Sequence, residues 1–227
     1  MKTFLKINML LIAGLLLLFP FSESRAATKP ELLLTWSADV FAPQGYSGKL
    51  IPSKGSTITA ALELIDGGKI INLSPYEVRW YRGDNLFKKG KGLKRISLTI
   101  DVSESIGVPL KAVVVGYKGV EEEATMGIPA KEPELIIDAP YPLRRVSDAT
   151  IELRALPYFF NIENISDLIF KWQANGISPQ GGSEASDILE LTLSSPASGS
   201  TISVSVSAEN TNDASEIKQA NIILTIQ

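Results

Sequence analysis

The sequence predicts an all-β protein of two antiparallel β-sandwiches in tandem, preceded by an N-terminal signal peptide. Apolar and polar residues alternate with a period of two in several runs of the 227-residue chain, and turns rich in glycine, aspartate and asparagine separate these runs. The net charge also changes sign near residue 131. Residues 27–131 carry 14 basic and 11 acidic side chains, a net +3, whereas residues 132–227 carry 5 and 13, a net −8. Such a change indicates a domain boundary.

The first 26 residues have the layout of a secretory signal peptide. Lys2 and Lys6 give a positive start, an apolar run follows from Met9 to Phe19, and Ser24-Arg25-Ala26 places small residues at the −3 and −1 positions. We expect cleavage after Ala26 or one residue later. The alternative is an uncleaved segment that anchors the chain, since the apolar stretch could span a thin membrane with tilt. In both cases we expect an extracytoplasmic protein, secreted or held at the cell surface.

Residues 27–131 and 132–227 are each predicted to form one sandwich. The stretch from Gly127 to Pro133 places two prolines and a glycine between apolar runs, which is typical of a short, stiff linker. Each piece has about 100 residues, enough for a core of its own without disulfides. Separate cores on either side of such a linker predict two independent unfolding steps.

The alternating runs occur in the same order in both halves, which we interpret as an internal repeat. In the first half they are Thr57–Leu64, Ile96–Val102 and the mostly apolar Ala112–Tyr117; in the second half the corresponding runs are Thr150–Leu156, Leu189–Leu193 and Ile202–Asn210, and one more alternating run, Ala220–Ile226, follows. Each half also has one strand that contains a tryptophan and ends at a turn, Trp80-Tyr81-Arg82-Gly83 in the first and Trp172-Gln173-Ala174-Asn175-Gly176 in the second.

These tryptophan strands, together with the alternating ending Gly199–Asn210, resemble tandem immunoglobulin-like or PKD-like domains of bacterial exported surface proteins. The resemblance implies that Trp80 and Trp172 are structural core residues. For Trp172 we expect Leu153 or Ala155, and Val204 or Val206, to face it across the sandwich. The resemblance also implies a role in adhesion, as a scaffold or as a spacer.

The composition excludes several classes of function. The chain has no histidine and no cysteine, so it has no Ser-His-Asp triad, no thiol nucleophile and no imidazole or thiolate metal site. A net charge of −3 argues against nucleic acid as a partner. We therefore expect a non-enzymatic exported binding or structural module with no catalytic residue, cofactor or metal. The alternative is a small carboxylate-based hydrolase acting on cell-envelope or extracellular glycan, which needs two carboxyls about 5 to 10 Å apart in a cleft.

Two segments are candidate contact surfaces. Five basic residues follow the Trp80 strand within eight positions, on an expected surface hairpin: Lys88, Lys89, Lys91, Lys94 and Arg95. They are suited to an anionic cell-envelope polymer, to another surface protein, or to the acidic half of a second copy in head-to-tail self-association. The alternative is that these lysines only protect a sheet edge from aggregation.

The second candidate is the long connection from Val40 to Ser56, which is too irregular for a strand and too apolar for a free linker. Phe41, Tyr46 and Leu50 on this connection form either a contact site on a rigid loop or a lid over the open end of the sandwich core. We expect contact with a membrane only through an uncleaved signal segment.

Overall fold

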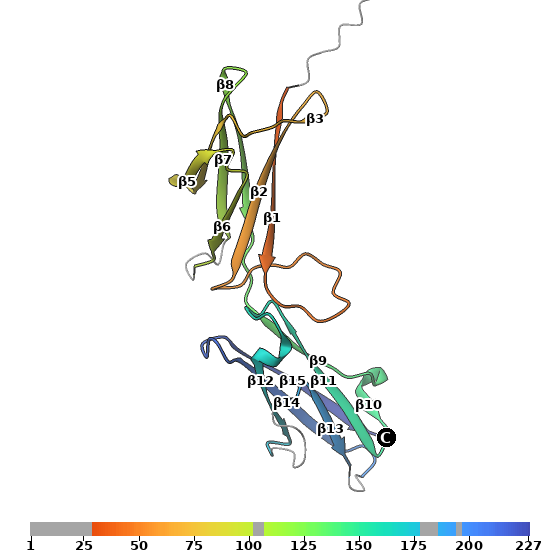
Figure 1. Cartoon of the computed structure of the whole chain (residues 1–227). Coiled ribbons are helices and arrows are strands. Elements are labelled where there is room, and N and C mark those ends of the chain that lie inside the picture. The colour runs from red at the N-terminus through yellow and green to blue at the C-terminus, as the bar shows by residue number, and fades with distance from the viewer. Residues whose placement is uncertain (1–28, 102–106, 178–185, 194–196) are drawn as a thin grey trace, which may run out of the picture.

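The computed structural model describes residues 29–101, 107–177, 186–193 and 197–227, so the predicted signal peptide and Val102 lie outside the described residues. These residues form two β-sandwiches joined end to end (Figure 1). The described helical turns are the short 3-10 segments η2 (Pro142–Arg144) and η3 (Ile165–Asp167), and the all-β prediction is confirmed. Within the described part of the chain, no helix has the length and apolar character that crossing a membrane requires.

The first sandwich consists of strands β1 to β8 in two sheets. In one sheet β2 is flanked by β1 and β6, and β3 forms a hairpin with the end of β2; the other sheet has the order β5-β4-β7-β8. The strands are β1 (Glu31–Asp39), β2 (Thr57–Asp66), β3 (Lys69–Ile70), β4 (Glu77–Arg82), β5 (Asn85–Lys91), β6 (Arg95–Thr99), β7 (Val108–Tyr117) and β8 (Val120–Ile128). All pairs in this sandwich are antiparallel.

The second sandwich consists of strands β9 to β15, after a connection of five residues, 129–133. Its sheets have the orders β13-β11-β9 and β10-β15-β14-β12, and only the short β10 pairs in parallel, with β15. The strands are β9 (Glu134–Asp138), β10 (Arg145–Val146), β11 (Thr150–Tyr158), β12 (Leu168–Ala174), β13 (Ile188–Thr192), β14 (Thr201–Asn210) and β15 (Ile217–Ile226).

One tryptophan lies in the core of each sandwich. Trp80 on β4 is fully buried and its Nε1–H donates to the carbonyl of Leu93 at 2.9 Å. Trp172 on β12 is 8% exposed and its Nε1–H donates to the carbonyl of Ser186 at 3.0 Å. A buried indole needs a partner for its single donor, and in both halves a backbone carbonyl supplies it.

The expected surroundings of Trp172 are partly wrong. β12 and β14 are neighbours in one sheet, and Trp172 lies directly opposite Val206 within that sheet, not across the sandwich from it. Val204 is likewise on β14, opposite Ala174, whereas Leu153 lies on β11 in the other sheet. The alternation in the sequence identifies the buried face of a strand, but it does not say which strands are neighbours.

Candidate functional site at the junction of the two sandwiches

The loop from Val40 to Ser56 leaves β1 at the junction and crosses to the second sandwich (Figure 1). The amide of Phe41 donates to the carbonyl of Phe160 at 2.8 Å, and the amide of Phe159 donates back to the carbonyl of Phe41 at 2.7 Å. Further along the loop, the carbonyl of Pro52 accepts from the amide of Lys131, in the connection between the sandwiches, at 2.9 Å. Backbone hydrogen bonds therefore tie this loop to both the connection and the second sandwich.

Two consecutive phenylalanines are buried in different cores. Phe159 belongs to the core of the first sandwich and Phe160 to that of the second. The backbone of Phe159 has φ +62°, a left-handed conformation that is rare for a bulky residue and costs on the order of 1–3 kcal/mol. This conformation ends the alternation of β11 and directs the adjacent rings to opposite sides. Burial of two aromatic rings, at about 150–250 Å² each, offsets the strain.

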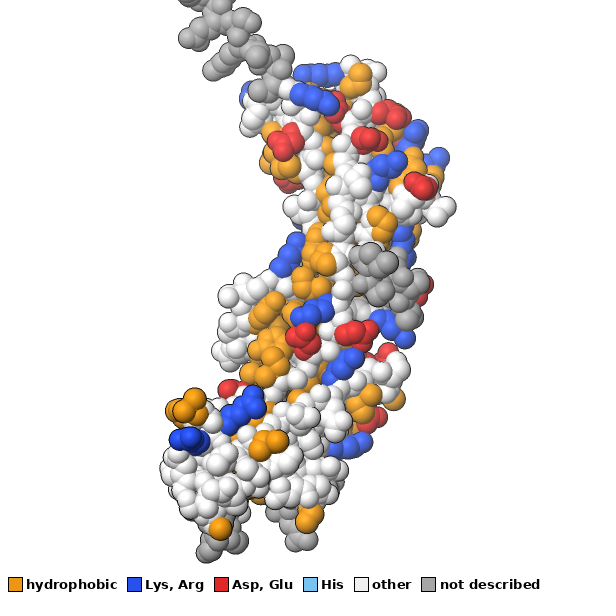
Figure 2. Space-filling view, turned by 180° about the vertical axis from the view of Figure 1, so that it is seen from behind, with side chains coloured by type: hydrophobic (Ala, Val, Ile, Leu, Met, Phe, Trp, Pro, Cys, Tyr) orange, Lys and Arg blue, Asp and Glu red, His pale blue; other side chains and the backbone are white. Residues whose placement is uncertain are grey.

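The aromatic exchange corrects the expectation of separate cores. Phe41 from the first half packs against the core of the second sandwich, while from the second half Phe159 lies in the core of the first and Tyr158 packs against it. Figure 2 shows hydrophobic side chains continuing across the junction on the face seen from behind, with charged side chains of both signs beside them. Each sandwich therefore depends on the other for part of its packing, and fully independent unfolding is not expected.

The three loop residues singled out from the sequence occupy different positions. Phe41 packs against the second core, Leu50 packs against the first, and Tyr46 is 38% exposed at the junction. The ring of Tyr46 contacts the rings of Tyr158 and Phe159 edge to face, with centroids 5.8 Å apart in both pairs. The loop thus seals the junction through Phe41 and Leu50, and presents Tyr46 partly to solvent.

Two further contacts hold Tyr46 and its loop in place. The Tyr46 hydroxyl donates to the carbonyl of Lys49 at 3.1 Å, and a Cβ atom at Gly48 would collide with the Tyr46 ring. The Nζ of Lys49 in turn lies 3.6 Å from the centre of the Trp36 ring on β1, a cation–π contact with the first sandwich. The loop is therefore attached to both sandwiches.

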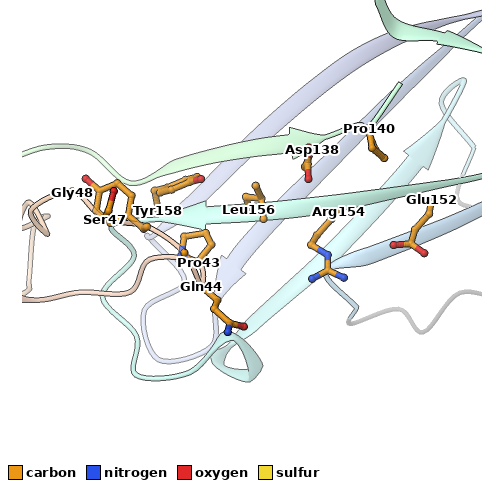
Figure 3. Close-up of a pocket in the computed structure, with 12 residues that line it drawn as sticks. Pro43, Gln44, Ser47, Gly48, Asp138, Pro140, Glu152, Arg154, Leu156 and Tyr158 are labelled. Atoms are coloured by element: carbon orange, nitrogen blue, oxygen red, sulfur yellow. The ribbon is translucent and has the colours of Figure 1, made fainter. Parts of the chain in front are cut away.

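A groove of about 670 Å³ lies between this loop and the outer face of the β13-β11-β9 sheet (Figure 3). The alternation of β11 creates one wall, because Ile151, Leu153 and Ala155 face the core and the residues between them face outward. The groove is lined by Pro43, Gln44, Gly45, Tyr46, Ser47 and Gly48 of the loop and by Asp138, Pro140, Glu152, Arg154, Leu156 and Tyr158 of the second sandwich.

Three charged side chains of alternating sign lie along this groove. Arg154 on β11 is directly opposite Asp138 on β9, and Glu152 lies two residues before Arg154 on the same face of β11 (Figure 3). All three side chains are exposed, and none of them makes a hydrogen bond or an ion pair with another residue that the structure describes. The groove therefore offers free donors from the guanidinium and free acceptors from two carboxylates.

Glu216 stabilises the side of the second sandwich that faces the junction. Its carboxylate accepts hydrogen bonds from the amide of Asn161, next to Phe160, at 3.0 and 3.1 Å, and from the Asn210 side-chain amide at 2.7 Å. Partial burial raises the pKa of Glu216, although these hydrogen bonds act in the opposite direction. Among the described residues, no group of three or more acidic side chains is arranged to hold a metal ion.

The five basic residues after Trp80 lie at one edge of the first sandwich but on two sheets. Lys88, Lys89 and Lys91 are on the edge strand β5, Arg95 is on β6 of the other sheet, and Lys94 connects the two. Acidic side chains lie close by on the same outer face as β5. Glu77 and Glu121 pair with Arg79 at 2.6 and 3.4 Å. The polyanion or partner contact at these five residues remains a prediction.

The charged groove residues Asp138, Glu152 and Arg154 were not identified from the sequence. Their period-two spacing with apolar neighbours is a signal that they share the outer face of one sheet. The sequence has no signal that the 43–48 segment, about 100 residues earlier, passes over that face.

No known family and no curated protein matches the chain. Among solved structures it is similar to the three N-terminal domains of the Highly Immunogenic Outer Capsid protein (Hoc) of bacteriophage RB49, with a TM-score of 0.47, 13% identity, and coverage of 86% of this chain and 59% of that one. It is also similar to fibronectin(III)-like modules of CbhA from Clostridium thermocellum, with a TM-score of 0.29, 18% identity, and coverage of 83% and 94%.

The chain thus spans about three fifths of the length of the Hoc structure. Likenesses of this size carry no information about ligands or activity, and the fold is established by the strand order. One sheet of the first half contains β1, β2 and β6, and one sheet of the second half contains β9, β11 and β13. In each half the tryptophan strand lies in the other sheet together with the last two strands. The chain consists of two antiparallel immunoglobulin-like sandwiches in tandem.

Proposed function

We propose that this protein is a non-enzymatic, extracytoplasmic binding and structural module whose two sandwiches act as one rigid arm. The junction carries this proposal. Domains that share a chain usually move relative to each other unless their interface is extensive and apolar. Here a five-residue connection, a hydrogen-bonded loop and an exchange of aromatic rings join them. A rigid arm suits adhesion, a scaffold or a spacer, because it holds a binding surface at a fixed distance.

A distance measurement between the sandwiches tests rigidity. The chain has no cysteine, so Lys69→Cys on β3 and Glu190→Cys on β13 would carry the only spin labels. We expect a narrow distance distribution that broadens in Phe41→Ala and stays narrow in Leu33→Ala, a control on β1 that lies outside the junction. A broad distribution in the labelled protein without further substitution would show that the two sandwiches move independently.

Export and partner are tested separately. If the chain is exported, mature protein from expressing cells should begin at Ala27 or Thr28, and N-terminal sequencing would identify this end. In pull-downs from envelope fractions, the mature protein should retain its partner. That partner is a cell-envelope polymer, another surface protein or a second copy of this chain. Intact Met1 on membrane-embedded protein would instead support the anchored alternative.

One observation favours the hydrolase alternative. Asp138 and Glu152 line the same groove and are diagonal neighbours on β9 and β11, a relation that places Cα atoms about 7–8 Å apart. Both side chains are exposed, however, whereas the general acid of a glycosidase typically lies in an apolar pocket. Release of sugar from envelope glycan that is lost in Glu152→Gln would replace the proposal with this alternative.

A further inference from the structure

We infer that the junction groove is a binding site for a neutral oligosaccharide. This inference rests on the proposed function as a binding module and specifies the ligand class of one site. It starts from the row Asp138, Arg154 and Glu152, whose side chains point into the groove without partners among the described residues.

The alternating charges select against ions and favour a neutral polyol. An anion at Arg154 would lie beside two carboxylates, and a cation at either carboxylate would lie beside the guanidinium, so each meets repulsion as well as attraction. A sugar hydroxyl both donates and accepts hydrogen bonds. A row of hydroxyls can therefore donate to Asp138 and Glu152 and accept from Arg154, so that all three charged groups are hydrogen-bonded to one neutral ligand.

The aromatic end of the groove supplies the apolar surface that the flat C–H faces of a sugar ring require. Tyr158 and Leu156 continue the outer face of β11 beyond Arg154 (Figure 3), and Tyr46 of the loop also lines the groove. Tyr46 is held by edge-to-face contacts with Tyr158 and Phe159, so little conformational entropy is lost when a ligand binds against it.

The groove is also preformed and of suitable size. β11 is paired on both sides, by β9 and β13, and the loop is hydrogen-bonded to the second sandwich. The volume of about 670 Å³ falls within the range of about 300–1,000 Å³ that is typical of ligand sites, which often lie between domains. Because one wall comes from each sandwich, binding also requires the rigid junction.

The test is calorimetric titration of the full chain, as the expressing cell processes it, with a panel of short neutral cello-, xylo-, manno- and malto-oligosaccharides. We expect at least one to bind with a dissociation constant of about 1 mM or tighter. Binding should weaken about tenfold or more in Arg154→Gln and in Glu152→Gln, both exposed strand positions where the fold tolerates change. Arg145→Gln on β10, outside the groove, is the matched control and should bind as the unmodified chain does.

Gly48→Ala provides a second, independent variant, because the new methyl group displaces the Tyr46 ring from the groove wall without altering any charge. It should also weaken binding, and binding by the unmodified chain should change little with salt because the ligand is neutral. Three results overturn the site: no binding of any neutral sugar on the panel, binding unaffected by the groove substitutions, or binding only of the anionic oligogalacturonate or the cationic oligolysine used as comparison ligands. Sugar release during titration would instead contradict the non-enzymatic function while leaving the groove as the sugar site.

Discussion

Replacing Trp172 with alanine tests how the second core is built and how it is coupled to the first. A tryptophan that is 8% exposed buries about 150–250 Å², which at about 25 cal/mol per Å² corresponds to about 4–6 kcal/mol. That figure is an upper bound, because the unfolded chain already buries part of this area. The substitution also leaves the carbonyl of Ser186 without its indole donor. We expect the free energy of unfolding of the second sandwich to fall by about 3–5 kcal/mol.

The assay uses the position of the other tryptophans. Trp36 and Trp80 both lie in the first sandwich, so the fluorescence of Trp172→Ala reports the first sandwich alone, while circular dichroism reports both. In urea we expect a lower midpoint for the second sandwich. The midpoint of the first should fall too, by a smaller amount, because Phe159 leaves its core when the second sandwich unfolds.

Gln173→Ala on the solvent face of β12 is the matched control and should change stability by no more than about 0.5 kcal/mol. A loss of that small size in Trp172→Ala itself would refute the placement of Trp172 in the core. A first-sandwich midpoint identical to that of the unmodified chain would refute the coupling through exchanged aromatic rings.

Three further outcomes are expected. Burial raises the pKa of Glu216 above its usual 4.5, so folding favours the protonated side chain. The contribution of Glu216 to the free energy of unfolding is therefore full below pH 4.5 and is lost as the pH rises through the higher folded-state pKa. Glu216→Gln should reduce the resulting pH dependence of stability, measured by unfolding in denaturant. The hydroxyl of Tyr117 donates a hydrogen bond to the carboxylate of Asp66 at 2.6 Å, and this bond raises the pKa of Tyr117 to about 12. The pKa of Asp66 is lowered by hydrogen bonds from Lys118, the larger effect, and from Tyr117. In Tyr117→Phe the pKa of Asp66 should therefore rise toward its usual value of 3.8, which carboxyl NMR would follow. If the five basic residues between Lys88 and Arg95 bind polyanions, retention of the protein on an anionic resin should fall steeply between about 50 and 200 mM salt. Replacing the five residues with serine should abolish this retention, and unchanged retention in that variant would reject the role.

Local patterns in the amino-acid sequence are enough to predict the strands and the buried face of most of them. The alternation in β2, β14 and β15 was sufficient, because the pleat of a strand sends successive side chains to opposite sides whatever its neighbours are. The all-β class followed from these local patterns and from the turns between them.

The pairing of the strands and the way in which the halves meet are evident only from the tertiary contacts. Val206 lies beside Trp172 within a sheet, five basic residues adjacent in sequence divide between two sheets, and Phe159 leaves its own sandwich for the core of the other. The groove likewise combines the 43–48 segment with β11. These arrangements depend on contacts between residues far apart in the chain, where packing against a particular partner, rather than local preference, determines the conformation that is most stable.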